Sequence, residues 1–229
     1  LEDKAIVIDP AITNPVKEWL LARKINLIAI LQTHHHHDHI GGSQGLLDEW
    51  PNAEIIASSK DKERIPFQTI SVKDKDTIEI LGTKIHIIEV KGHTKAHIAY
   101  YIPPIKDRLN QPILFCGDSL FGAGCGRIFE GSYEDMYKSL IRLNNLPGDT
   151  EVYCAHEYTE ANLEWAQSIE PENNAIKERL SLLIKNKNNE NFLSIPSTIK
   201  LERETNLFLR ANDLNKFRRL RESKDHWKG

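Results

Sequence analysis

The chain has 229 residues, 40% of them hydrophobic, and its 30 basic and 33 acidic side chains leave a formal net charge of −3. The hydrophobic fraction is enough for a core, and the near-neutral charge gives no reason to expect nucleic acid or an anionic membrane as a partner. The sequence has no signal-peptide pattern, and no apolar run approaches the roughly 20 residues of a membrane span. Three cysteines cannot all pair, which fits a reducing compartment. We therefore expect a cytoplasmic protein.

Strand-like runs recur along the first two thirds of the chain. They are rich in β-branched residues and are bounded by Gly, Pro or Asp, which predicts strands over residues 4–8, 27–32, 54–58, 84–90, 97–102, 113–116 and 151–155. Helical patterns interleave with them over residues 15–24, 45–50 and 133–145, with Ser132 as the N-cap of the last helix. This alternation predicts an α/β protein built in layers.

The pattern changes near residue 160, where helical periodicity replaces the strands. We expect helices over residues 160–170, 171–187 and 213–227. The boundary predicts a metal-binding α/β domain over residues 1–160 and a small helical domain over residues 161–229.

The most informative segment is Thr33 to His39, which reads T-H-H-H-H-D-H after an apolar, strand-like run. Imidazole and carboxylate groups are ligands that zinc and iron prefer. If the segment is extended, alternation places His34, His36 and Asp38 on one side while His39 points elsewhere. One short segment could then serve two cations, or one cation and the groups that orient its ligands.

Two simpler interpretations compete with a metal site. A purification tag would lie at a terminus and would lack the aspartate. The other simple interpretation is a solvated histidine-rich loop. It is weakened because further candidate ligands also follow apolar runs, namely His93, Asp118 and His156. A strand, then a small residue, then His or Asp is the pattern that a metal site at one sheet edge requires. The metal site is therefore the favoured interpretation.

Four motifs together resemble the metallo-β-lactamase superfamily: T-H-x-H-x-D-H at Thr33 to His39, G-H-T at Gly92 to Thr94, G-D at Gly117-Asp118, and His156. Three more are similar to glyoxalase II, the hydroxyacylglutathione hydrolases: Gly122 to Arg127 with Glu130-Gly131, Ala155 to Thr159, and Arg221-x-x-Lys224-Asp225. The resemblance covers essentially the whole chain and implies an αββα sandwich followed by a small C-terminal helical domain. Family members usually carry a further strand before the first one expected here, so we expect that residues preceding Leu1 are missing.

The resemblance implies two divalent metal ions, most readily zinc, with iron or manganese also compatible. It assigns His34, His36 and His93 to one ion, Asp38, His39 and His156 to the other, and Asp118 to both. Asp38 and Asp118 are the implied catalytic carboxylates. Metal coordination lowers the pKa of water to about 7, which provides a nucleophile at neutral pH.

Glutathione carries two carboxylates, so a complementary site should offer cations. Matching the family residue by residue gives the substrate-binding candidates Arg127, Phe129, Tyr158, Arg221 and Lys224. Arg221 and Lys224 would share a helix face, for which solvation is the simpler interpretation. Arg127 stands where the family often has Lys, and Phe129 stands where a substrate-facing Tyr is common, so one hydroxyl is lost.

The implied reaction is the hydrolysis of S-D-lactoylglutathione to D-lactate and glutathione, the second step of methylglyoxal detoxification. We expect a monomer whose partner is this small molecule. A thiol with a pKa near ~8.5 leaves without a dedicated general acid, which suits a thioester. Two alternatives stay open: a persulfide dioxygenase with one iron, and a metal-binding protein without catalysis. The segment Gly124 to Arg127 and the helical tail favour the hydrolase.

Overall fold

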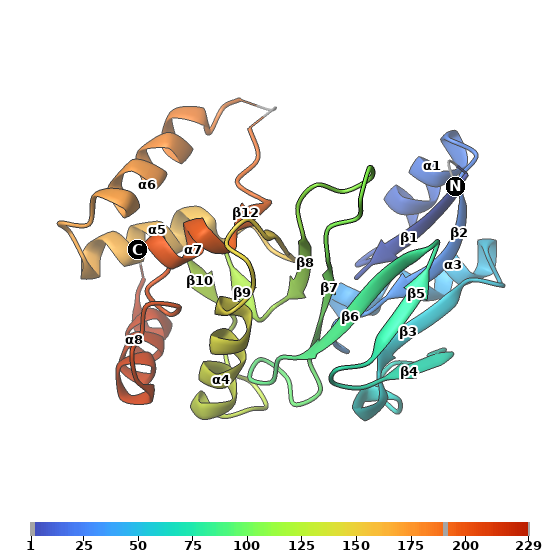
Figure 1. Ribbon diagram of the computed structural model, residues 1–229, viewed down its shortest axis with the longest axis horizontal. Coiled ribbons are helices and arrows are strands. Elements are labelled where there is room, and N and C mark those ends of the chain that lie inside the picture. The colour runs from blue at the N-terminus through green and yellow to red at the C-terminus, as the bar shows by residue number, and fades with distance from the viewer. Residues whose placement is uncertain (1–2, 190–191, 229) are drawn as a thin grey trace. The chain divides into compact units, whose positions relative to one another are not determined.

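The computed structural model describes residues 3–189 and 192–228. The chain divides into two compact units, one of residues 1–89 with 96–101, the other of residues 90–95 with 102–229. Figure 1 shows the helices and strands of each unit in chain order. The predicted division of the chain at residue 160 concerns a different boundary and stays a prediction.

The first unit contains a parallel and an antiparallel set of strands. The parallel set consists of β1 (Lys4–Ile8), β2 (Asn26–Leu31), β3 (Glu54–Ser58) and β4 (Ile70–Val72), each paired with the next. In the antiparallel set, β6 (Thr83–Glu89) pairs with β5 (Thr77–Ile80) on one side and with β7 (Ile98–Ile102) on the other.

Two helices complete the parallel part of this unit, α1 (Thr13–Ala22) and α3 (Ser43–Glu49). Apolar side chains of both helices and of β2 and β3 form one core cluster, which includes Leu20, Ile30, Leu46 and Ile55. Because parallel strands end at the same edge of a sheet, the residues that follow β1 and β2 are brought close together.

The second unit starts from two parallel strands, β8 (Ile113–Gly117) and β11 (Glu151–Cys154), and the short antiparallel strand β12 (Ser197–Thr198) joins β11. A small hairpin, β9 (Leu120–Phe121) with β10 (Gly124–Cys125), follows β8 directly. Helix α4 (Tyr133–Asn144) connects the hairpin to β11 and begins with the predicted cap Ser132, which forms a capping box with Asp135.

Helices dominate the rest of the second unit, coloured orange to red in Figure 1: α5 (Thr159–Ile169), α6 (Asn174–Asn186), α7 (Ile199–Thr205) and α8 (Leu214–His226). An aromatic cluster joins α5 to α8 through Phe208, since Trp165 of α5 stacks on Phe208 at 5.1 Å and Phe208 meets Phe217 of α8 edge-on at 5.7 Å. Among residues 3–189 and 192–228, no helix combines the length and apolar character needed to cross a membrane.

Every strand and helix expected from the sequence is present, with ends that agree within three residues. The sequence did not predict the short strands β4, β5, β9, β10 and β12, the helix α7, or α2 (His37–Ile40). Six of these seven elements span only two to four residues, a length at which a periodic pattern seldom stands out.

The expectation of an extended segment through Asp38 was wrong. The extended conformation ends at His36, with φ −61° and ψ 146°, and a helical turn begins at His37. The backbone N–H of His39 bonds to the His36 carbonyl at 3.0 Å, so the chain coils here. Neighbours on a helical turn point about 100° apart rather than to opposite faces, so Asp38 and His39 can face the same region.

Candidate metal and substrate site

The first unit brings four predicted ligands together just after β2. His34 Nε2 lies 3.0 Å from His36 Nδ1, and the rings of His34 and His39 are 4.0 Å apart between centroids. His39 Nε2 lies 3.8 Å from a carboxylate oxygen of Asp38, whose side chain is 56% exposed. The helical turn at His37 is what lets these four groups converge.

Asp9, which follows β1, orients two of these histidines. Its carboxylate accepts hydrogen bonds from the Thr33 hydroxyl at 2.6 Å and from His39 Nδ1 at 2.9 Å. Since an ionised carboxylate only accepts, the proton of His39 sits on Nδ1. The Thr33 hydroxyl donates its one hydrogen bond to Asp9, so its oxygen accepts a hydrogen bond from His34 Nδ1 at 3.1 Å. Both rings therefore present Nε2 with its lone pair, as metal binding requires.

Asp9 was not among the predicted functional residues. The available signal was its position: it ends the run Ala5 to Ile8, just as the other predicted ligands end their strands. Its φ of 48° is unusual for a residue with a side chain, and its bonds to Thr33 and His39 hold it there.

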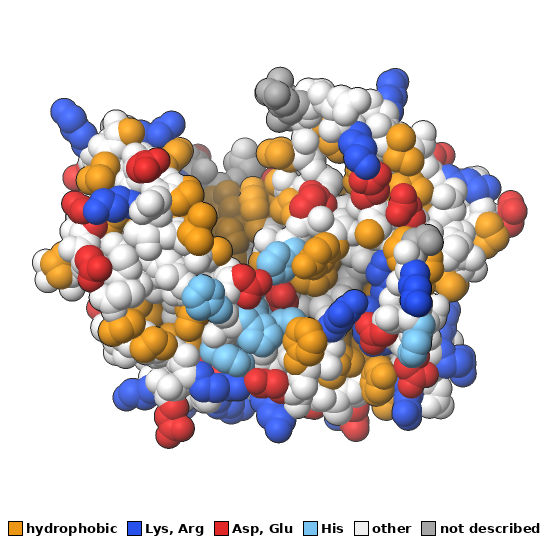
Figure 2. Space-filling model, turned by 180° about the vertical axis from the view of Figure 1, so that it is seen from behind, with side chains coloured by type: hydrophobic (Ala, Val, Ile, Leu, Met, Phe, Trp, Pro, Cys, Tyr) orange, Lys and Arg blue, Asp and Glu red, His pale blue; other side chains and the backbone are white. Residues whose placement is uncertain are grey.

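The histidines that were not predicted as ligands have other surroundings. His97 is fully buried and stacks on His34 at 4.6 Å. His35 lies 3.6 Å from the buried carboxylate of Asp61, which also pairs with Arg64. Histidine side chains reach the surface on the face shown in Figure 2, where acidic and basic side chains are interspersed.

The second unit supplies the other three predicted ligands. Asp118 and His156 follow the parallel strands β8 and β11, and so lie at the same edge. His93 Nε2 lies 3.4 Å from one oxygen of Asp118, and His156 Nε2 lies 3.5 Å from the other. Two ligands that are each about 2.1 Å from a tetrahedral ion are about 3.4 Å apart. The spacing fits a carboxylate that shares one ion with each histidine.

A backbone carbonyl fixes the ring of His93. His93 Nδ1 lies 2.8 Å from the Arg127 carbonyl oxygen, which can only accept, so Nδ1 carries the proton and Nε2 faces Asp118. The chain passes very close here, since a Cβ at Gly126 would lie 1.9 Å from the Asp118 carbonyl oxygen. Only glycine permits this approach.

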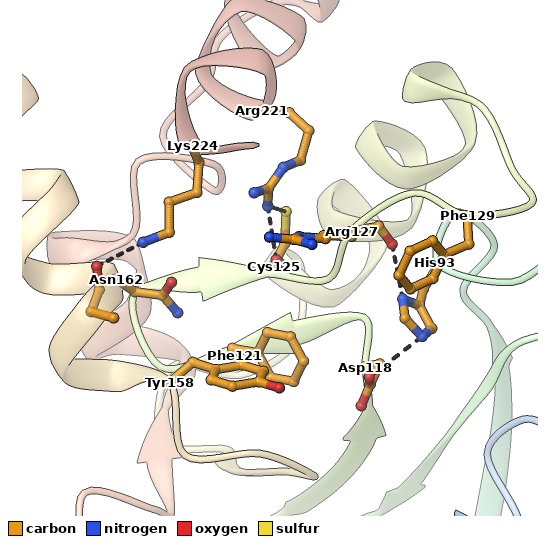
Figure 3. Close-up of a pocket in the computed structure, with 11 residues that line it drawn as sticks. His93, Asp118, Phe121, Cys125, Arg127, Phe129, Tyr158, Asn162, Arg221 and Lys224 are labelled. Atoms are coloured by element: carbon orange, nitrogen blue, oxygen red, sulfur yellow. Dashed lines mark hydrogen bonds and ion pairs between the residues drawn. The ribbon is translucent and has the colours of Figure 1, made fainter. Parts of the chain in front are cut away.

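A pocket of about 410 Å³ opens beside these ligands (Figure 3). His93 and Asp118 line it together with every predicted substrate-binding residue: Arg127, Phe129, Tyr158, Arg221 and Lys224. Four residues that were not predicted to bind substrate also line the pocket: Phe121, Cys125, Ala161 and Asn162. These four come from the β9–β10 hairpin and from α5, whose place beside the pocket depends on the tertiary fold.

The solvated-face interpretation does not hold for Arg221. Its side chain is 5% exposed, it donates to the Cys125 carbonyl oxygen at 3.0 Å, and it pairs with Asp225 at 2.8 Å. Arg218 and Arg219 on the same helix are exposed. Helix α8 thus turns one arginine into the pocket wall and leaves the others in water.

Lys224 has an unusual environment at the other end of the pocket. Its ammonium donates to the Ala161 carbonyl oxygen at 2.7 Å and lies 4.2 Å from the ring of Trp227. Burial, and secondarily the charge of Arg221, lowers the pKa of Lys224 to about 8. This group therefore loses its positive charge in mildly alkaline solution.

Two exposed aromatic rings sit against predicted ligands. Tyr158 is 49% exposed and stacks over His156 at 5.3 Å, while Phe129 is 64% exposed and meets His93 edge-on at 5.2 Å. Exposed aromatic surface in a pocket is available to a ligand.

The three cysteines offer no thiolate nucleophile. Burial raises the pKa of Cys125 and Cys154 to about 11, and raises the pKa of Cys116 well above its ordinary value. All three remain thiols at neutral pH. The chemistry of the site therefore belongs to the histidines and carboxylates, a set that suits a divalent metal ion.

Comparison with known proteins gives matches along the whole chain. Residues 1–156 match the metallo-beta-lactamase superfamily, and residues 157–227 match the hydroxyacylglutathione hydrolase C-terminus. A hydroxyacylglutathione hydrolase of Prochlorococcus marinus (strain MIT 9303) is 55% identical over 226 residues, which cover 99% of this chain and 86% of that protein. The hydroxyacylglutathione hydrolase of Parasynechococcus marenigrum (strain WH8102) is 50% identical over 226 residues, which cover 99% of this chain and 90% of that protein.

Solved structures agree in fold. ETHE1 from Myxococcus xanthus aligns with a TM-score of 0.69 at 22% identity, over 96% of this chain and 80% of that one. A metallo-β-lactamase from Staphylococcus aureus subsp. aureus COL aligns with a TM-score of 0.71 at 20% identity, over 99% of this chain and 61% of that one. The predicted fold class, a metallo-β-lactamase-like αββα sandwich with a C-terminal helical region, is confirmed. The chain belongs to the metallo-β-lactamase superfamily and, within it, to the hydroxyacylglutathione hydrolases.

Proposed function

We propose that this chain hydrolyses the thioester of S-D-lactoylglutathione and related 2-hydroxyacylglutathiones, as the second step of methylglyoxal detoxification. Water adds its oxygen to the acyl carbon, the C–S bond breaks, and the sulfur leaves as the thiolate of glutathione. The observation that carries the proposal is the pocket in which His93 and Asp118 lie beside Arg127, Arg221 and Lys224. Such a pocket joins metal-ligand chemistry to cations that match the carboxylates of glutathione.

The residues fit a pair of divalent metal ions, zinc first, with iron or manganese also compatible. The proposed ligands are His34, His36, Asp38, His39, His93, Asp118 and His156. Bound ions would lower the pKa of water and polarise the thioester carbonyl. The lone pairs at Nε2 of His34, His39 and His93, and the two-sided spacing at Asp118, support this assignment. Asp38 and Asp118 are the proposed catalytic carboxylates.

The three cationic side chains of the pocket have different proposed roles in binding glutathione. Arg127 is exposed and lies 4.0 Å from Asp225, so its planar guanidinium can turn to a substrate carboxylate. Lys224 adds a second positive charge. Arg221 already donates to Cys125 and Asp225, so it contributes charge and holds the pocket wall. Tyr158 and Phe129 provide apolar surface near the thioester, without the hydroxyl that a Tyr at position 129 would add.

We also propose that residues 1–160 form the catalytic domain and residues 161–229 the domain that binds glutathione. The boundary between the two family matches, at residues 156 and 157, supports this division. The proposed enzyme acts as a cytoplasmic monomer on a small molecule.

The decisive experiment combines a thioester assay with elemental analysis of the same preparation. Loss of thioester absorbance from S-D-lactoylglutathione, with two ions per chain, is the expected result. Oxygen consumption that depends on a glutathione persulfide, with one iron and no thioester cleavage, would establish the dioxygenase instead. A metal-loaded chain inactive in both assays would leave a metal-binding protein.

A further inference from the structure

The β9–β10 hairpin carries Phe121 and Cys125 into the pocket and leads directly to Gly126 and Arg127. Its turn residue Ala123 has a φ of 55°, in the left-handed region that residues with a Cβ rarely adopt. A turn of this kind persists only where its surroundings hold it. The groups that hold this turn therefore influence the shape of the pocket.

The buried carboxylate of Glu202, on α7, holds the turn. Glu202 is fully buried, and one of its oxygens accepts the Ala123 backbone N–H at 2.8 Å and the Asn206 side-chain amide at 3.1 Å. The other oxygen accepts the Ser197 hydroxyl and pairs with Arg179 at 2.8 Å. Four donors fix the carboxylate, and a fixed carboxylate fixes Ala123.

Asn206 forms a second anchor one helical turn further along. Its amide nitrogen donates to the Gly124 carbonyl oxygen at 2.9 Å and lies 3.4 Å from that of Phe121. Its side-chain oxygen accepts the Phe208 backbone N–H at 3.0 Å, so the amide cannot rotate freely. The hairpin backbone is thus bonded on both sides of Ala123.

The anchored hairpin determines where two functional groups lie. The carbonyl oxygen of Arg127, two residues beyond β10, sets the ring of His93. Gly126 rests against the Asp118 backbone with no room for a Cβ. A displaced hairpin would therefore move the Arg127 guanidinium and the His93 ring together.

We propose that Glu202 is a positioning residue, which holds the β9–β10 hairpin through Ala123 and Asn206 so that Arg127 and His93 face the pocket. The proposal deepens the glutathione-thioester function and rests on it. A purely structural Glu202 would affect the stability of the chain alone. A positioning Glu202 affects ligand binding and metal retention in chains that are still folded.

The test is Glu202→Gln, which keeps the shape but replaces one acceptor oxygen with a donor that opposes the existing donors. We expect kcat/KM for S-D-lactoylglutathione to fall about 10- to 100-fold, a range typical of residues that orient metal ligands. The dissociation constant of S-hexylglutathione, a thioether that cannot be hydrolysed, should rise about 10-fold or more. Glu204→Gln is the matched control, because Glu204 is exposed on the same helix and should behave as wild type.

Asn206→Ala provides a second variant that leaves the pair of Glu202 and Arg179 intact. It tests whether the hairpin anchor affects binding and turnover if Glu202→Gln does not fold. We expect a loss of about 2- to 10-fold in both measurements, the size of a lost hydrogen bond. Folded variants that lower only the melting temperature, with wild-type binding, turnover and metal content, overturn the proposal. A wild-type chain that binds S-hexylglutathione but cleaves no thioester refutes the proposed reaction. The binding of S-hexylglutathione by the variants would still test the positioning role of Glu202.

Discussion

The two groups of predicted ligands are built in opposite ways. In the first unit, His34, His36, Asp38 and His39 lie within six consecutive residues, and Asp9, a side chain far back in the sequence, orients His34 and His39. In the second unit, the ligands come from three separated segments, and a backbone carbonyl orients His93. A contiguous motif can be read from the sequence, whereas its orienting partner cannot. A dispersed set depends on the parallel pairing of β8 and β11.

The largest effect should come from Asp118, which faces a histidine on each side. Asp118→Ala should lower kcat/KM by about 10³-fold or more and remove one of the two proposed metal ions, since the proposal assigns this carboxylate to both ions. Elemental analysis and the thioester assay measure both. Full activity with one ion lost would contradict a shared carboxylate. Asp149→Ala serves as the control, because Asp149 lies in the turn before β11, at the opposite end of this strand from His156.

Asp9 tests the other half of the comparison. Asp9→Asn keeps the size of the side chain but leaves one acceptor oxygen. Its amide nitrogen would face either the Thr33 backbone N–H, or the Thr33 hydroxyl together with His39 Nδ1, and all of these groups are donors to Asp9. Metal affinity or activity should fall about 10- to 100-fold, as for other groups that orient metal ligands. A chelator titration measures the affinity, and Asp3→Asn, near the start of the same strand, is the matched control. Wild-type metal affinity in Asp9→Asn would show that the histidines of the Thr33–His39 segment are oriented without Asp9.

Arg127 and Arg221 separate substrate contact from support of the pocket. Arg127→Ala should raise KM about 10-fold with little change in kcat, because the lost contact is to a remote part of the substrate. Arg221→Ala should also raise KM and should lower the melting temperature, since it removes the buried bonds to Cys125 and Asp225. Arg218→Ala, exposed on α8, should change neither quantity. An unchanged KM in Arg221→Ala would restrict Arg221 to a structural role.

The smallest expected effect is a pH dependence from Lys224. Because its pKa is about 8, the ammonium is charged below that pH and neutral above it. The proposed role of Lys224 is to bind a substrate carboxylate in its charged form, so KM should rise about 3- to 10-fold as the pH passes upward through 8. Steady-state kinetics between pH 6.5 and about 9.5 measure this step. Lys224→Met should abolish the step and Lys228→Met should keep it; the same step in both variants would assign it to another group.

The regular elements and the ligand motifs were largely predictable. Long periodic segments such as α4 and α8 have clear caps, Ser132 and Asp213, and their apolar spacing is plain in the sequence. Elements of two or three residues carry too little pattern, which is why the β9–β10 hairpin was missed. The helical turn at His37 was missed for the same reason.

The sequence by itself determined the family, the set of candidate ligands and the cations that match glutathione, because these depend on residue types at fixed spacings. Only the tertiary structure decided that Asp9 orients His39, that Arg221 is buried in a pocket wall, and that Glu202 bonds to Ala123. The physical reason is that each of these contacts joins residues about 30 to 100 positions apart, whereas local preferences act over a few residues.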